Sequence, residues 1–184
     1  MSVTNKAANR AIVRQGIKAY KEEILKTVQF NAELFCDFLC EQAIKHRETA
    51  PGKHDFTGNL LNSIVVCLYK KNKPVYASYA AERVAKAIQV KMTAPKKYSF
   101  KSDYEGAQSY YNPTIKTDEG WGERDAAAFF RSYNPHNNSL FTIVVAYPVE
   151  YAEWVEAMRA TAGILNVYVE ANNHGVQYLM LPRA

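Results

Sequence analysis

Apolar residues recur every three or four positions along the first fifty residues of the chain. The stripe consists of Ile17, Tyr20, Ile24, Val28, Ala32, Phe35, Leu39 and Ala43. This spacing predicts one long amphipathic helix, which Pro51-Gly52 ends. Because glycine weakens a helix by about 1 kcal/mol relative to alanine, we expect Gly16 to separate an N-terminal arm from the main helix.

Uninterrupted apolar runs further along the chain are typical of buried strands. Residues 64–68 form the first run, and the sequence Lys-Lys-Asn-Lys-Pro at 70–74 then predicts a turn into a return strand. Pro148 ends a later run because it lacks the N–H that a strand ladder needs. The predicted strands are residues 64–68, 75–79, 140–147, 164–171 and 176–181, with a turn at 172–175.

The order of the elements predicts the fold class. Helical spacing also occurs at 79–92, 123–133 and 150–158. A long N-terminal helix followed by meandering strands predicts an α+β fold, with the helix packed on a small antiparallel sheet. The length of 184 residues fits a single domain. Its expected parts are a helical arm and main helix (1–50), a core (56–92 and 140–184) and an irregular insertion (94–139).

The expected insertion is rich in tyrosine, asparagine, proline, glycine, lysine and serine. Disordered segments usually lack aromatic residues, and the amphipathic tyrosine ring suits interfaces, so we expect this segment to order against a partner. Its candidate subunit-interface residues are Tyr98, Tyr104, Tyr110, Tyr111, Trp121, Phe129 and Phe130. Interleaved lysine and tyrosine could also stack single-stranded nucleic acid, although glycines and acids interrupt the basic track.

A basic stripe lies on the predicted arm of a chain whose net charge is +5. Lys6, Arg10, Arg14, Lys18 and Lys21 step by four, four, four and three, and no acid precedes Glu22. Such a stripe suits contact with DNA or with an acidic protein partner. A solvated helix face is the more common origin of such a stripe, and the sequence leaves both interpretations open.

Catalytic and metal-binding patterns are missing from the sequence. There is neither a glycine-rich phosphate loop nor a nucleophile elbow, and the four histidines are scattered in polar segments. Cys36 and Cys40 share one helical face without further ligands nearby, so we expect the three cysteines to be small buried hydrophobes. We therefore expect no enzyme activity, no cofactor and no metal.

The membrane-spanning and secreted classes are also not expected. The longest apolar runs are far shorter than the ~18 residues of a membrane span, and the first residues lack the apolar segment of a signal peptide. An odd, small number of cysteines suits a reducing compartment. We therefore expect a soluble intracellular protein with no membrane partner.

Two segments resemble a known family. Phe-Thr-Gly-Asn-Leu-Leu-Asn-Ser-Ile (56–64) is similar to the Thr-Gly-Asn-Leu-x-x-Ser-Ile element of neck and tail-completion proteins at the head–tail junction of lambdoid-type siphophages. Val-Ala-Tyr-Pro-Val-Glu-Tyr-Ala-Glu-Trp-Val-Glu (145–156) is similar to the family's Tyr-Ala-x-x-Val-Glu element. The matching positions are Thr57, Gly58, Asn59, Leu60, Ile64, Tyr151, Ala152, Val155 and Glu156.

The chain also departs from the family pattern. Residues 70–139 are a large insertion, Ala157-Met158 replaces the family's Gly-Thr, and no final helix is expected. The resemblance implies a structural virion protein of the neck or tail, assembled in the host cytoplasm. Its copies would form a homo-oligomeric ring between connector and tail proteins, with the genome DNA passing through the ring. The alternative is a nucleic-acid-binding protein that uses the basic helix and the Tyr/Lys-rich insertion.

Overall fold

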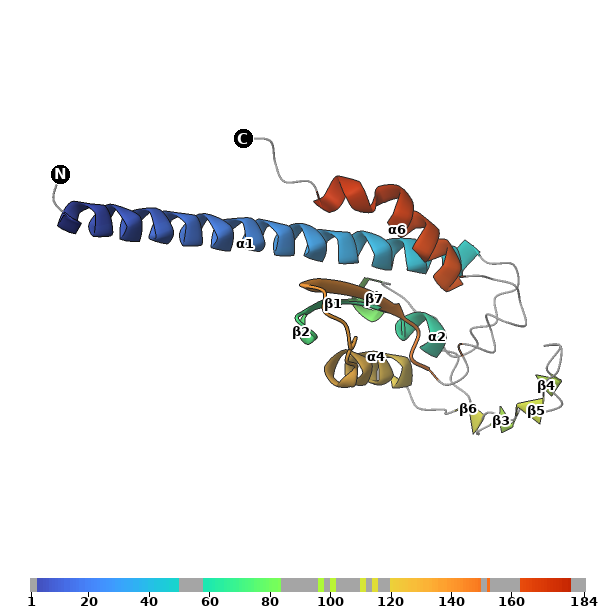
Figure 1. Ribbon diagram of the computed structural model, residues 1–184. Coiled ribbons are helices and arrows are strands. Elements are labelled where there is room, and N and C mark those ends of the chain that lie inside the picture. The colour runs from blue at the N-terminus through green and yellow to red at the C-terminus, as the bar shows by residue number, and fades with distance from the viewer. Residues whose placement is uncertain are drawn as a thin grey trace.

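A computed structural model describes residues 3–49, 58–83, 96–97, 100–101, 110–111, 114–115, 120–149, 152 and 163–179. The helices are α1 (Val3–Thr49), α2 (Asn59–Asn62), α3 (Ala80–Arg83), α4 (Trp121–Ser132) and α6 (Gly163–Leu179). The longer strands are β1 (Val65–Lys70), β2 (Lys73–Tyr79) and β7 (Phe141–Ala146). This mixture of a long helix and a small antiparallel sheet confirms the predicted α+β class (Figure 1).

The sheet has the strand order β2-β1-β7, and both pairings are antiparallel. Lys71 and Asn72, both with positive φ, form the two-residue turn that joins β1 to β2. Such a turn matches the twist of the strands on either side. The strands predicted at 64–68, 75–79 and 140–147 are thus confirmed, and the apolar run at 64–68 belongs to the central strand.

Helices cover both faces of the sheet. Figure 1 shows α1 and α6 on one side and α4 on the other. Successive side chains of a strand point to opposite faces. Val66 and Leu68 of β1 therefore pack toward α1, whereas Val65, Cys67 and Tyr69 pack in the cluster that includes Ala126 of α4. Burial on both faces explains why the run in β1 is continuously apolar.

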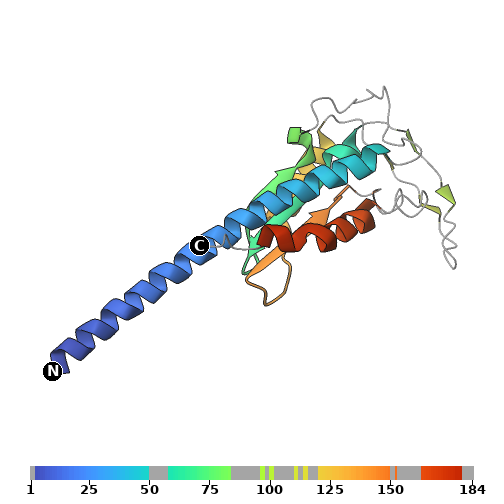
Figure 2. The same cartoon turned by 90° about the horizontal axis from the view of Figure 1, so that it is seen from above.

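Helix α1 continues through Gly16, so the expected break between an arm and a main helix is wrong. A glycine costs a helix only about 1 kcal/mol, which a helix of 47 residues tolerates. The separation that does exist is one of packing. The first half of the helix projects away from the rest of the protein, and the second half lies on the sheet (Figure 2).

The C-terminal segment corrects the sequence prediction. Residues 164–171 and 176–181 were expected to be strands around a turn, but Gly163–Leu179 is one helix, α6. Val167, Ala171 and Tyr178 recur at helical spacing and pack against the core that α1 shares with the sheet. Gly175 allows the close approach, because an added Cβ would lie 3.3 Å from the Phe35 ring. Tertiary packing on α1 outweighs the strand preference of the branched residues in 164–169.

The segment expected to be an irregular insertion contains regular structure. Helix α4 overlaps the helix predicted at 123–133 but begins earlier, at Trp121, and it covers one sheet face. Two short strand pairs are antiparallel: β3 (Lys96–Lys97) pairs with β6 (Thr114–Ile115), and β4 (Phe100–Lys101) pairs with β5 (Tyr110–Tyr111). Both pairs follow the same register. Helix α3 lies within the 79–92 prediction. Residues 84–92, and all of 150–158 except the helical Ala152, lie outside the described residues.

Candidate functional site

The turn before β1 lies where the segments 56–64 and 145–156 meet. Gly58 has φ 73°, a backbone conformation that glycine adopts readily, and it precedes the single helical turn α2. Leu60 of α2 is buried in one cluster with Trp121, Val149 and Ala152. Leu60 belongs to the 56–64 segment, and Val149 and Ala152 belong to the 145–156 segment. Two stretches far apart in the sequence therefore share one small core.

We call the small core of Leu60, Trp121, Val149 and Ala152 the joint. Polar contacts beside it hold α2 against α4. The Asn59 side chain is buried, and its Oδ1 accepts a hydrogen bond of 3.2 Å from the backbone N–H of Gly122. The Ser63 hydroxyl donates to the carbonyl of Leu60 at 2.8 Å, which closes α2. A Cβ on Gly122 would lie 2.0 Å from the backbone oxygen of Asn59, so only glycine fits at this crossing. Asn59 and Ser63 thus hold backbone in place.

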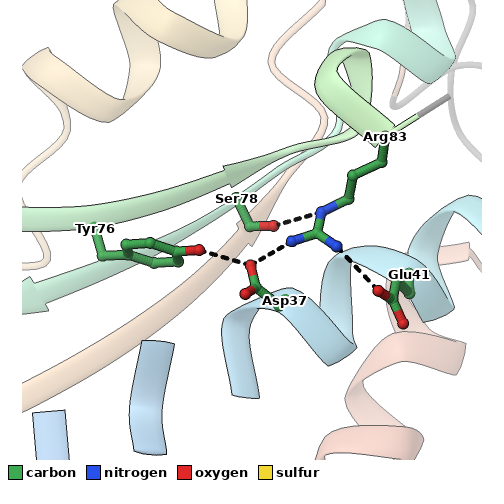
Figure 3. Close-up of polar contacts among 5 residues, drawn as sticks. All are labelled: Asp37, Glu41, Tyr76, Ser78 and Arg83. Atoms are coloured by element: carbon green, nitrogen blue, oxygen red, sulfur yellow. Dashed lines mark hydrogen bonds and ion pairs between the residues drawn. The ribbon is translucent and has the colours of Figure 1, made fainter. Parts of the chain in front are cut away.

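A second polar cluster connects α1 with β2 and α3 (Figure 3). The Arg83 guanidinium donates to Asp37, to Glu41 at 2.9 Å and to the Ser78 hydroxyl at 3.0 Å. The Tyr76 hydroxyl donates to Asp37 at 2.8 Å. Burial and this bond to the carboxylate raise the pKa of Tyr76 to about 12. One cation faces two carboxylates, so the cluster fixes α3 on α1 and keeps an excess of negative charge.

Sequence reasoning missed this cluster. The available signal was the spacing of Glu33, Asp37 and Glu41, which places three acids at four-residue intervals along α1. Arg83, the partner of Asp37 and Glu41, follows more than forty residues later, and only the packing of β2 and α3 on the helix brings it there. Helical spacing identifies the acids on α1 and carries no information about Arg83 of α3.

The three cysteines are buried free thiols: Cys36 and Cys40 lie in the cluster between α1 and the sheet, and Cys67 lies in the cluster on the face that α4 covers. Burial raises the pKa of Cys40 to about 11 and that of Cys67 to about 12, and it raises the pKa of Cys36 as well. At neutral pH all three are protonated and therefore weak nucleophiles. Their position confirms that the cysteines act as small hydrophobes.

Alkaline conditions are expected to destabilise the protein through these thiols. The folded pKa of Cys67 lies above its ordinary value of 9.0. Below pH 9 the Cys67 thiol keeps its proton in both the folded and the unfolded chain, so it does not lower the free energy of unfolding. Above that pH the unfolded chain ionises first, which favours unfolding by about 1.4 kcal/mol per pH unit up to the folded pKa. Denaturant unfolding should therefore show that, between about pH 8 and pH 11, the free energy of unfolding falls less steeply with pH in Cys67→Ala than in the wild type. Parallel pH profiles would contradict this assignment.

The predicted basic residues lie together on the first half of α1, residues 6–23, which projects from the rest of the described structure and is called the projecting half. Lys6, Arg10, Arg14, Lys18 and Lys21 are all exposed. The apolar stripe of the helix divides at the same place: Phe35 and Leu39 are buried in the core, whereas Ile17 and Tyr20 are exposed. The projecting half therefore carries both cationic and exposed apolar side chains, which makes it a candidate interaction surface.

The residues predicted for a subunit interface are divided by the structure. Trp121 is only 4% exposed and belongs to the interior, and Phe129 and Phe130 pack partly buried in the cluster with Tyr69. Tyr110 and Tyr111 form β5, of which only the backbone is described. Tyr98 and Tyr104 lie outside the described residues, as do Thr57, Tyr151, Val155 and Glu156. The aromatic enrichment at 121–130 therefore reflects a core helix.

Neither a metal site nor a membrane helix is found in the described part of the chain. No group of three or more histidine, cysteine, aspartate or glutamate side chains there is arranged to hold a metal ion. No helix there is both long enough and apolar enough to cross a membrane. The candidate sites are therefore the joint around Leu60 and the projecting half of α1.

Comparisons with known proteins give no direct assignment. No model of a known protein family, no curated protein and no solved structure matches the chain.

Proposed function

We propose that the protein is a structural virion subunit that forms a homo-oligomeric ring at the head–tail junction of a tailed bacteriophage. The observation that carries this proposal is the shared cluster of Leu60, Val149 and Ala152. The two segments that resemble neck and tail-completion proteins build one joint between α2, α4 and the end of β7. Residues that resemble one family at two distant places and also meet in space support a common structural role.

The C-terminal helix supports the same proposal. A missing final helix was one of the departures from the family pattern, and α6 is a helix of 17 residues that packs along α1. The chain therefore has a long N-terminal helix, a sheet and a final helix in the order that the resemblance implies. The extra structure between β2 and β7 remains a difference.

The distribution of surfaces also suits a ring. In a head-to-tail ring each subunit offers two different surfaces to its neighbours. The projecting half of α1 provides reach beyond the subunit, while the rest of the chain forms its own core around both faces of the sheet (Figure 2). The buried side chains hold the fold together. We therefore propose that the protein acts as a structural ring subunit, through its position and its contacts with neighbouring subunits.

The mass of the native assembly tests this function. The purified full chain should form rings of defined stoichiometry as its concentration rises, visible by native mass spectrometry and negative-stain electron microscopy. Rings should also appear when the chain is mixed with connector and tail proteins of the phage that encodes it. A chain that stays monomeric under both conditions would refute the ring proposal.

Nucleic-acid binding is the second candidate, and the exposure of Lys6, Arg10, Arg14, Lys18 and Lys21 favours it. Neutralising phosphates releases counterions, so duplex binding should fall steeply as salt rises. Replacing Lys6, Arg10, Arg14 and Lys18 by glutamine should remove about four contacts and flatten the salt slope accordingly. Binding with an unchanged slope would exclude the basic stripe as the site.

A further inference from the structure

We propose that the projecting half of α1 in one subunit docks along the second half of α1 in a second copy of the chain. The first observation is the exposure of its large apolar side chains. Ile12, Val13, Ile17 and Tyr20 are 66%, 58%, 51% and 64% exposed. Single exposed apolar residues are common, but four within nine residues of one helix form a patch of the kind that marks an interaction site.

The second half of α1 presents a matching apolar surface. Phe30 and Leu34 are one turn apart, and they are 59% and 43% exposed although this part of the helix lies on the folded body. Residues at this spacing share a helix face. Both halves of α1 therefore carry large apolar side chains that this chain alone does not cover.

Charge decides which surfaces meet. The projecting half carries Lys6, Arg10 and Arg14 at four-residue intervals, and two such halves would repel each other. The second half carries Glu33, Asp37 and Glu41 at the same intervals. Opposed rows with equal spacing can match base to acid along their length. Arg83 neutralises only one of the two carboxylates that it contacts, so the acceptor keeps negative charge.

The acceptor must belong to another molecule. Because α1 is one continuous helix from Val3 to Thr49, its first half cannot fold back on its own second half (Figure 2). A second copy supplies the acidic and apolar row without any further partner. The subunit then has a donor surface on residues 6–23 and an acceptor surface on residues 30–41, which are the two different surfaces that a ring needs.

The size of the contact predicts how it behaves. The donor surface of 18 residues is about 27 Å long and the acceptor surface of 12 residues is about 18 Å long, so the contact extends over only about three helical turns. Stable protein–protein interfaces usually bury at least about 1,200 Å². The contact is therefore weak between two free chains and strong when a closed assembly repeats it. This inference rests on the proposed ring, for which it specifies the contact between neighbours.

Removing the apolar donor side chains tests the contact. The full chain with Ile17→Ser and Tyr20→Ser should associate about tenfold or more weakly in sedimentation experiments. Its thermal unfolding should stay close to that of the wild type, because both positions are exposed. Tyr168→Ser is the matched control, since Tyr168 is 63% exposed on α6, away from the projecting half. Equal association of the double variant and the control would overturn the proposal.

A charge exchange tests the pairing of the two surfaces. One variant carries Arg10→Glu with Arg14→Glu, and the other carries Glu33→Lys. Asp37 and Glu41 are left unchanged because both bind Arg83. Each variant alone should fail to assemble, and an equimolar mixture should assemble again because every contact then joins opposite charges. A mixture that remains unassembled would overturn the proposal.

The outcomes separate this inference from the proposed function. Rings that form unchanged with both the serine and the charge variants would overturn the docking of α1 and leave the ring function standing. A wild-type chain that never self-associates, even with its connector partner, would overturn both. Loss of duplex binding in the Arg10/Arg14 variant with unchanged assembly would assign the projecting half to DNA, against the proposal.

Discussion

Replacing Gly122 with alanine is expected to destabilise the protein by about 3 kcal/mol or more. The new Cβ would lie 2.0 Å from the backbone oxygen of Asn59 and 3.0 Å from the backbone nitrogen of Ser63. Both contacts are backbone atoms of α2 and its cap, so no side chain can rotate away. Separating α4 from α2 would also break the bond from Gly122 N–H to Asn59 Oδ1.

Gly16→Ala is the matched control for this prediction. Alanine favours a helix over glycine by about 1 kcal/mol, and this preference alone would predict stabilisation at both positions. A Cβ at Gly16 meets no atom within 4 Å, so that variant should gain up to about this amount. Denaturant unfolding followed by circular dichroism measures both changes. Shifts of the same sign in the two variants would show that α2 and α4 do not cross as described.

Truncating Ile64 to alanine is expected to reduce the free energy of unfolding by about 2–5 kcal/mol. Ile64 is fully buried where α2 meets β1, and its carbonyl accepts the N–H of Ala80 at 3.0 Å. Its side chain packs in the core that contains Leu39 of α1 and Val66 and Leu68 of β1. Truncation leaves a cavity under helix and sheet together. Leu60→Ala should cost a similar amount through the separate cluster with Trp121.

Ile12→Ala provides the control, because it makes the same chemical change at a position 66% exposed on the projecting half of α1. Its effect on the unfolding of the free chain should lie within about 0.5 kcal/mol of zero. Chemical denaturation at a concentration where the chain is unassembled measures all three variants. A near-zero effect at Ile64 would mean that the joint before β1 does not belong to the core.

The elements with strong periodicity could be predicted from the sequence. The three- and four-residue spacing in α1 predicts a helix, and the short apolar runs of β1 and β7, bounded by turn residues, predict strands. Helix α6 could not be predicted in this way. Its branched residues favour a strand, and the close approach of Gly175 to Phe35 that holds it as a helix depends on α1 being beside it.

The candidate sites divide in the same manner. The basic stripe on α1 was predicted residue by residue, because helical spacing alone places those side chains on the first half of the helix. Trp121 was expected at an interface, yet its side chain is buried in the interior. Composition does not distinguish an aromatic residue that packs within its own chain from one that packs against another subunit. The same limit concealed the bonds between Arg83 and the acids of α1.

By itself, the sequence determined the α+β class, the long amphipathic helix and the continuous apolar strand, since local periodicity is enough to specify them. Only the tertiary structure decided that the apolar stripe of α1 is covered along one half and uncovered along the other. It also decided that Leu60 meets Val149 and Ala152. The physical reason is that burial depends on which surfaces meet, and contacts between distant segments are set by the packing of the whole chain.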